Sequence, residues 1–179
     1  MGDFAARRQT DFIINKPNRK PPLQWLESTK GAPLPNGSFL VGTQNGKNLY
    51  IARTGNPPDS LCGPLVEGES LLVPTEMDSD PVAYIDSYKV LVIANPRSVH
   101  WVPVSDRRKM EGTISAGRKN GKNLLIGRVP YKRNNVTEWR VGMVSESGNT
   151  LACQCPCKDN DFDSVDMYTV DVEILCLKP

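Results

Sequence analysis

Two nearly identical stretches, 75 residues apart, decide the expected fold. Residues 45–53 read Asn-Gly-Lys-Asn-Leu-Tyr-Ile-Ala-Arg and residues 120–128 read Asn-Gly-Lys-Asn-Leu-Leu-Ile-Gly-Arg, so seven of nine positions are identical. Self-similarity at a fixed spacing indicates an internally repeated architecture. The sequence therefore predicts two copies of one unit, at residues 21–98 and 99–179. Residues 1–20 have no counterpart and are expected to form a basic N-terminal arm.

The match between the copies extends beyond these stretches. Trp25 aligns with Trp101, and Gly42 aligns with Gly117. Further on, residues 85–90 align with residues 165–170, where the spacing has grown from 75 to 80. The change predicts five inserted residues in the second copy, and the polar stretch 131–135 is their expected place.

Short strands dominate the predicted secondary structure. The Asn-Gly pairs predict tight turns before the strands at 49–51 and 124–126. Apolar and polar residues alternate over 168–174, which predicts a half-buried strand. Residues 23–28 are the one helix candidate, and 14 glycines and 15 prolines argue against long helices.

The expected fold class is all-β, with two tandem antiparallel-strand repeats, internal pseudo-two-fold symmetry and a shared core. A shared core is expected because a unit of about 75 residues is only marginally stable alone.

Charge is balanced overall but not along the chain. The net charge is +2, yet residues 97–140 carry eleven basic and three acidic side chains. Such a segment is typical of an anion-binding face for nucleic acid or a sulfated glycan. The alternative is that basic and acidic segments neutralise each other in the fold.

The cysteines favour buried free thiols over a metal site. Cys153, Cys155 and Cys157 alternate, so their sulfur atoms would lie on one face of a strand. Zinc sites usually separate cysteines by two to four residues and need four ligands. The acidic run at 159–163 lacks the glycine and the terminal glutamate of a calcium loop. We therefore expect reduced cysteines, no metal and no cofactor.

No membrane segment or secretory signal is expected. The first eight residues contain no apolar run, and no stretch approaches the roughly 18 apolar residues of a membrane span. These features predict a cytoplasmic protein, with non-classical release or association with vesicles left open.

The sequence predicts a binding protein rather than an enzyme. It has no nucleophile elbow, no phosphate loop and no dinucleotide fingerprint. The repeated turns offer amide and ammonium groups that suit sugar hydroxyls, although Asn-Gly also serves positive φ in a turn. Basic Arg118, Lys119 and Lys122 favour anionic ligands at the second turn. The candidate ligand-binding residues are Asn45, Lys47, Asn48, Arg53, Asn120, Lys122, Asn123 and Arg128.

Each copy resembles the DM-nine repeat, an invertebrate family that includes mannose-binding lectins. The family pattern is a Trp segment, Leu-Pro-x-Gly, a glycine with a turn, a strand like Leu-Tyr-Val-Gly-Arg and a closing Tyr-Glu-Val-Leu-Val. The resemblance implies an all-β tandem fold, innate recognition or binding at host or pathogen surfaces, and often a homodimer. The matching residues are Trp25, Leu34–Gly37, Gly42, Leu49–Arg53 and Tyr88–Val92 in the first copy, and Trp101, Gly112, Gly117, Leu124–Arg128 and Tyr168–Val172 in the second.

The chain departs from the sugar-binding pair of the lectin members. There, a turn aspartate and the lysine of a Pro-Gly-Lys-Val segment hold the sugar. Here the turns at 43–46 and 118–121 contain no acidic residue, and Pro64 and Met143 occupy the lysine positions. The expected function is carbohydrate binding without the family mannose pair. The alternative is a non-catalytic interaction scaffold or an anion-binding module that uses residues 97–140.

Overall fold

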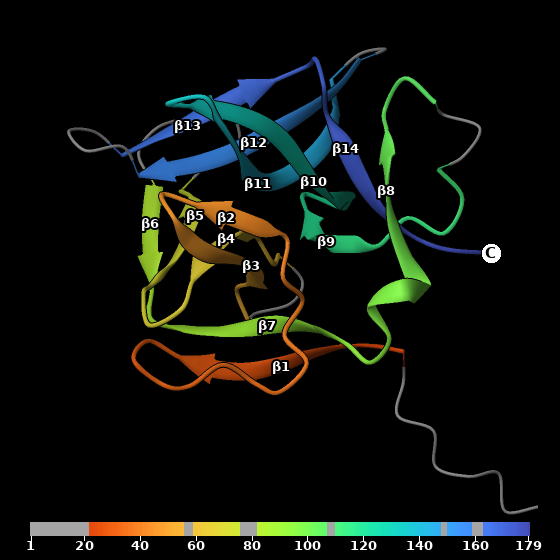
Figure 1. Cartoon of the computed structure of the whole chain (residues 1–179). Helices are drawn as coiled ribbons and strands as arrows, with labels where there is room; N and C mark the ends of the chain where they lie inside the picture. The colour runs from red at the N-terminus through yellow and green to blue at the C-terminus, as the bar shows by residue number, and fades with distance from the viewer. Residues whose placement is uncertain (1–21, 56–58, 76–81, 107–109, 148–149, 159–162) are drawn as a thin grey trace, which may run out of the picture.

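The computed structural model describes residues 22–55, 59–75, 82–106, 110–147, 150–158 and 163–179. Within these ranges the regular secondary structure is antiparallel strand, apart from the 3₁₀ turn η1 (Pro96–Ser98). The predicted all-β fold is therefore confirmed (Figure 1). None of the described helical residues forms a helix long and apolar enough to cross a membrane.

The first half of the chain forms a five-stranded sheet and a two-stranded sheet. The larger sheet has the order β1-β7-β3-β2, and β4 also pairs with β3, whereas β5 pairs with β6. The strands are β1 (Leu23–Thr29), β2 (Gly42–Gln44), β3 (Lys47–Arg53), β4 (Cys62–Val66), β5 (Leu71–Pro74), β6 (Val82–Ile85) and β7 (Ser87–Ile93).

The second half forms one seven-stranded sheet. Its order is β13-β12-β11-β10-β14-β8, and β9 also pairs with β10. The pairing β8-β14-β10-β9 therefore repeats the pairing β1-β7-β3-β2 of the first half. Pseudo-two-fold symmetry in space stays a prediction. The strands are β8 (Val99–Pro103), β9 (Ser115–Lys119), β10 (Lys122–Arg133), β11 (Val136–Ser147), β12 (Thr150–Lys158), β13 (Asp163–Tyr168) and β14 (Glu173–Leu177).

Two secondary-structure predictions are wrong. The helix candidate at 23–28 is strand β1, because its residues pair along the whole of β7, with Trp25 opposite Leu91. The single strand at 168–174 is also wrong, because β13 ends at Tyr168 and β14 begins at Glu173. Val170, between them, is 69% exposed. The alternation of apolar and polar residues over 168–174 therefore spans the end of β13, the bend between the strands and the start of β14.

The ladders also correct the alignment of the two halves. Arg53 pairs with Lys89, and Arg128 pairs with Glu173, so β7 matches β14 and not residues 165–170. The expected loop at 131–135 is instead the end of β10 and the turn to β11. The insertion lengthens the β10–β11 hairpin. Every later strand of the second half is therefore farther along the sequence from its counterpart in the first half.

The two halves share a hydrophobic core, as expected. Leu49 and Ile51 of β3 lie in one buried cluster with Leu124 and Ile126 of β10, and all four are at most 1% exposed. Strand β11 packs against β2 and β4, as the stacked position of the halves in Figure 1 shows. Burial across this contact joins the halves into one unit.

Matched glycines bring the halves close together. Gly42 has a φ of +159° and Gly117 a φ of +152°. A Cβ at Gly42 would overlap the indole of Trp139 in the other half. A Cβ at Gly117 would overlap the carbonyl oxygen of Ser60, whose N–H donates to Arg118 O over 3.1 Å. Each glycine therefore permits a contact that a side chain would block.

Gly117→Ala is expected to destabilise the protein more than Gly121→Ala. Both glycines have positive φ, but a Cβ at Gly121 would meet nothing within 4 Å. The backbone conformation costs about 1 kcal/mol in either variant, and overpacking against Ser60 adds about 1–3 kcal/mol. Urea unfolding measures the difference. Equal free energies of unfolding for the two variants would contradict the close approach.

Candidate functional site

The eight predicted ligand-binding residues do not form one site. Asn45 and Lys47 line a pocket between the halves, and Lys122 and Asn123 line a separate one. Arg53 and Asn123 line a third cavity. Asn48 is exposed on β3 opposite Thr43. Asn120 forms a hydrogen bond to the other half and Arg128 forms an ion pair, and both contacts are described below.

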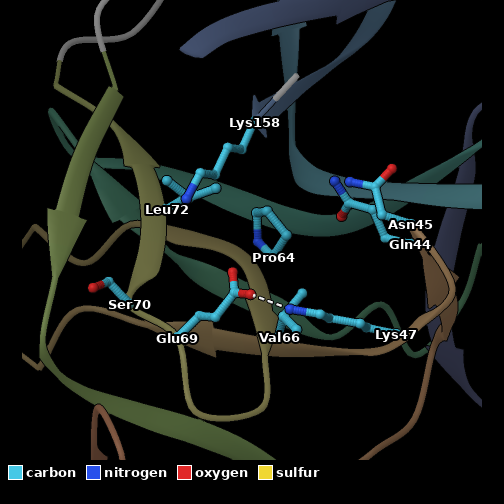
Figure 2. A pocket seen from close by; sticks show the side chains of 9 residues that line it. All are labelled: Gln44, Asn45, Lys47, Pro64, Val66, Glu69, Ser70, Leu72 and Lys158. Atoms are coloured by element: carbon cyan, nitrogen blue, oxygen red, sulfur yellow. Dashed lines mark hydrogen bonds and ion pairs between the residues drawn. The ribbon is translucent and has the colours of Figure 1, made fainter. Parts of the chain in front are cut away.

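The pocket at the first turn combines residues from both halves. It measures about 300 Å³, at the lower end of the usual range for small-ligand sites. Figure 2 shows Lys158 of β12 on one side and the turn residues Gln44 and Asn45 on another. The lining residues are Gln44, Asn45, Lys47, Pro64, Val66, Glu69, Ser70, Leu72 and Lys158.

A carboxylate and an ammonium group face each other in this pocket. Lys47 Nζ donates to Glu69 Oε1 over 2.8 Å, and the two side chains are 63% and 41% exposed (Figure 2). Tyr88 Oη holds the Glu69 backbone by donating to its carbonyl oxygen over 3.2 Å. Glu69 belongs to the β4–β5 turn, marked in the sequence by Gly68 with a φ of +81°. Glu69 is not among the predicted site residues because it lies outside the repeated turns.

The rest of the pocket adds apolar surface and further polar groups. Pro64, Val66 and Leu72 supply the apolar part. Lys158 Nζ lies 5.8 Å from the centroid of the Tyr84 ring. Tyr84 does not line the pocket; its hydroxyl donates to Asp163, which raises the pKa of Tyr84 to about 12. Donors, an acceptor and an apolar surface thus meet in one concave site.

Each repeated turn is held by an acidic residue of the other half. The Gly46 N–H donates to Glu138 Oε1 over 3.0 Å, and the Asn120 N–H donates to Asp59 Oδ1 over 3.2 Å. Asn45 has a φ of +52° and Asn120 a φ of +50°, which confirms the turn role of the Asn-Gly pairs. The positive φ values account for the Asn-Gly pair of each turn without a ligand.

Two arginines of the basic segment form ion pairs within the second half. Arg128 Nε donates to Glu173 Oε2 over 2.6 Å, and its guanidinium lies between the rings of Trp101 and Trp139, 4.3 and 3.7 Å from their centroids. Arg140 pairs with Asp166. Neutralisation within the fold therefore accounts for these two charges. Residues 107–109 of the segment lie outside the described residues.

All five cysteines are buried and none forms a disulfide in the structure. Cys153, Cys155 and Cys157 alternate along β12 and lie in one buried cluster, as predicted, and the residues between them are buried as well. The Sγ atoms of Cys153 and Cys155 are 3.5 Å apart. The described residues contain no group of three metal-ligating side chains. The Asp run at 159–163 falls largely outside these residues.

Thiol labelling is expected to be slow in the folded protein. Burial raises the pKa of Cys62 to about 12 and holds the pKa of Cys155 well above its usual value, so both remain neutral thiols at pH 8. A chromogenic disulfide reagent should find five thiols after unfolding and react with none promptly before it. Prompt labelling of the native protein, or stoichiometric zinc by elemental analysis, would contradict this expectation.

Glu138→Ala is expected to destabilise the protein more than Asp59→Ala. Glu138 is 7% exposed, so its removal leaves the Gly46 N–H without its acceptor in a partly buried contact. The expected cost is about 1–3 kcal/mol. Asp59 accepts from the Asn120 N–H of the other turn at an exposed position, where the cost should be below about 1 kcal/mol. Chemical unfolding of both variants tests the difference, and equal losses would contradict it.

A comparison with protein families identifies the repeat. No curated protein matches the chain. A family model for the DM9 repeat matches residues 44–161, which is more than half of the sequence. The matched region contains the repeated turns, the strands β3 and β10 and the pocket residues Lys47 and Glu69. The chain therefore belongs to the DM9 repeat family.

Proposed function

We propose that this protein is a non-catalytic, lectin-like carbohydrate-binding protein whose sugar site is the pocket of Lys47 and Glu69. The observation that supports the proposal is an accessible carboxylate–ammonium pair beside an apolar surface in a concave site. Vicinal sugar hydroxyls need an acceptor and a donor a few ångströms apart, and charged partners give the stronger hydrogen bonds.

The location of the pocket agrees with the family resemblance. In the lectin members a turn aspartate and a lysine hold the sugar, and here the pocket is lined by the turn residues Gln44 and Asn45 and by Pro64 at the lysine position. Lys47 and Glu69 provide the same two kinds of group from neighbouring positions. Mannose is therefore retained as the first sugar to test.

The wider biological role rests on the resemblance alone. A role in innate recognition, binding at a host or pathogen surface and assembly as a homodimer belong to this proposal because lectin members of the family imply them. The pocket itself contains residues of both halves of one chain, so sugar binding as proposed needs no second copy.

Glu69→Gln is expected to weaken sugar binding about 10- to 100-fold. The change keeps the size of the side chain but removes the charged acceptor, a loss of about 1.5–3 kcal/mol. Isothermal titration with methyl α-mannoside, or with the sugar that a glycan array selects, measures the effect. Glu67→Gln is the matched control, because Glu67 is an exposed acid on the same turn and does not line the pocket.

Two results would contradict the proposal. One is that no neutral glycan on the array binds the wild-type protein. The other is that Glu69→Gln and Glu67→Gln bind the selected sugar equally well, which would place the site elsewhere. Circular dichroism of each variant shows that the sheet is retained.

A further inference from the structure

We propose that a second cavity, at the junction of the two halves, binds a tetrahedral oxyanion, a sulfate or phosphate group, through Arg53, Lys89 and Arg118. The cavity measures about 420 Å³ and shares no lining residue with the pocket of Lys47 and Glu69. Its described lining residues contain three cationic side chains and no carboxylate. This site is independent of the proposed sugar site.

The first observation is a cross-strand pair of two cationic residues. Arg53 of β3 lies directly opposite Lys89 of β7. At the matching ladder position of the second half, Arg128 lies opposite Glu173 and forms an ion pair of 2.6 Å. Like charges directly opposite each other destabilise an antiparallel pair. An anion bound between Arg53 and Lys89 would supply the negative charge that Glu173 supplies in the second half.

The second observation is a third cation from the other half. Arg118 of β9 lines the same cavity, and its Nη2 donates to Gly121 O over 3.2 Å. The Ser60 N–H donates to Arg118 O over 3.1 Å, which fixes the Arg118 backbone against the first half. Ser60 brings a hydroxyl group to the cavity and Asn123 brings an amide, whereas the Ser115 hydroxyl donates to Gly117 O over 3.1 Å. An oxyanion needs such convergent donors on several sides.

The third observation concerns the orientation of the cations. The Arg53 guanidinium carbon lies 4.5 Å from the centroid of the Trp25 ring, and Arg53 lines the cavity. Lys89 Cε lies 3.7 Å from the position of a Cβ at Gly55, so the side chain extends toward the loop after β3. Glu27 lies opposite Lys89 on β1. Among the described residues, neither Arg53 nor Lys89 forms an ion pair.

The burial of Arg53 also favours the binding of an anion. Burial lowers the pKa of Arg53 from its ordinary value, because the charged guanidinium loses water. A bound oxyanion would restore favourable interactions to that charge. The pKa of Arg128 is also lowered by burial, but Glu173 opposes the effect there.

The decisive variant is Lys89→Glu, which places a carboxylate directly opposite Arg53, as Glu173 lies opposite Arg128. Isothermal titration at constant ionic strength would use inorganic sulfate, inorganic phosphate, a sulfated disaccharide and the same disaccharide without sulfate. The wild type should bind the anions, and Lys89→Glu should weaken that binding about tenfold or more. Tighter binding of the sulfated disaccharide than of inorganic sulfate would identify a sulfated sugar as the source; equal binding would identify the free ion.

The matched control is Lys132→Glu, which makes the same charge change at an exposed position of β10 outside the cavity. It should keep the wild-type affinity. Arg118→Gln is a second variant, at an exposed side chain, and should weaken binding even if Lys89→Glu folds poorly. Absence of anion binding by the wild type, or equal losses in Lys89→Glu and Lys132→Glu, would overturn the proposal. Glu69→Gln should leave anion binding intact, so failure of the sugar site is distinguishable.

Discussion

The close approach of each repeated hairpin to the opposite half is the constraint on which the rest of the structure depends. Gly42 lies against Trp139 and Gly117 lies against Ser60, in both cases without room for a Cβ. The adjoining turns receive a carboxylate from the opposite half. A half on its own would leave these turns without their acceptors and the shared core exposed, so the duplicated unit functions structurally as a pair.

Residues at equivalent positions of the two halves contact different side chains. Arg128 and Arg53 occupy the same place in the repeated sequence and in the ladder. In the second half the guanidinium is enclosed by two indoles and paired with Glu173, which makes it a structural residue. In the first half one indole and an opposing lysine replace them. The difference is one of partners, because the backbone pairing is the same.

The sequence predicted the fold class because its strongest signals are local. The Asn-Gly pairs and the alternation of the β12 cysteines depend on backbone geometry within a few residues, and both predictions were confirmed. Strand β1 was missed because its seven residues lack a period of two, and only its pairing with β7 defines it. Glu138 and Asp59 could not be placed beside the turns from the sequence, since the contacts span 92 and 61 residues.

The change at the family's lysine positions also has a structural reason. Met143 is fully buried, and its Sδ accepts a hydrogen bond of 3.2 Å from the Cys62 N–H across the two halves. Pro64 is buried opposite Ile51 in the adjoining strand. A lysine at position 143 would place an ammonium group in this core, where an unpaired charge costs several kcal/mol. Met143 therefore belongs to the buried contact between the halves, whereas Pro64 is an apolar lining residue of the pocket of Lys47 and Glu69.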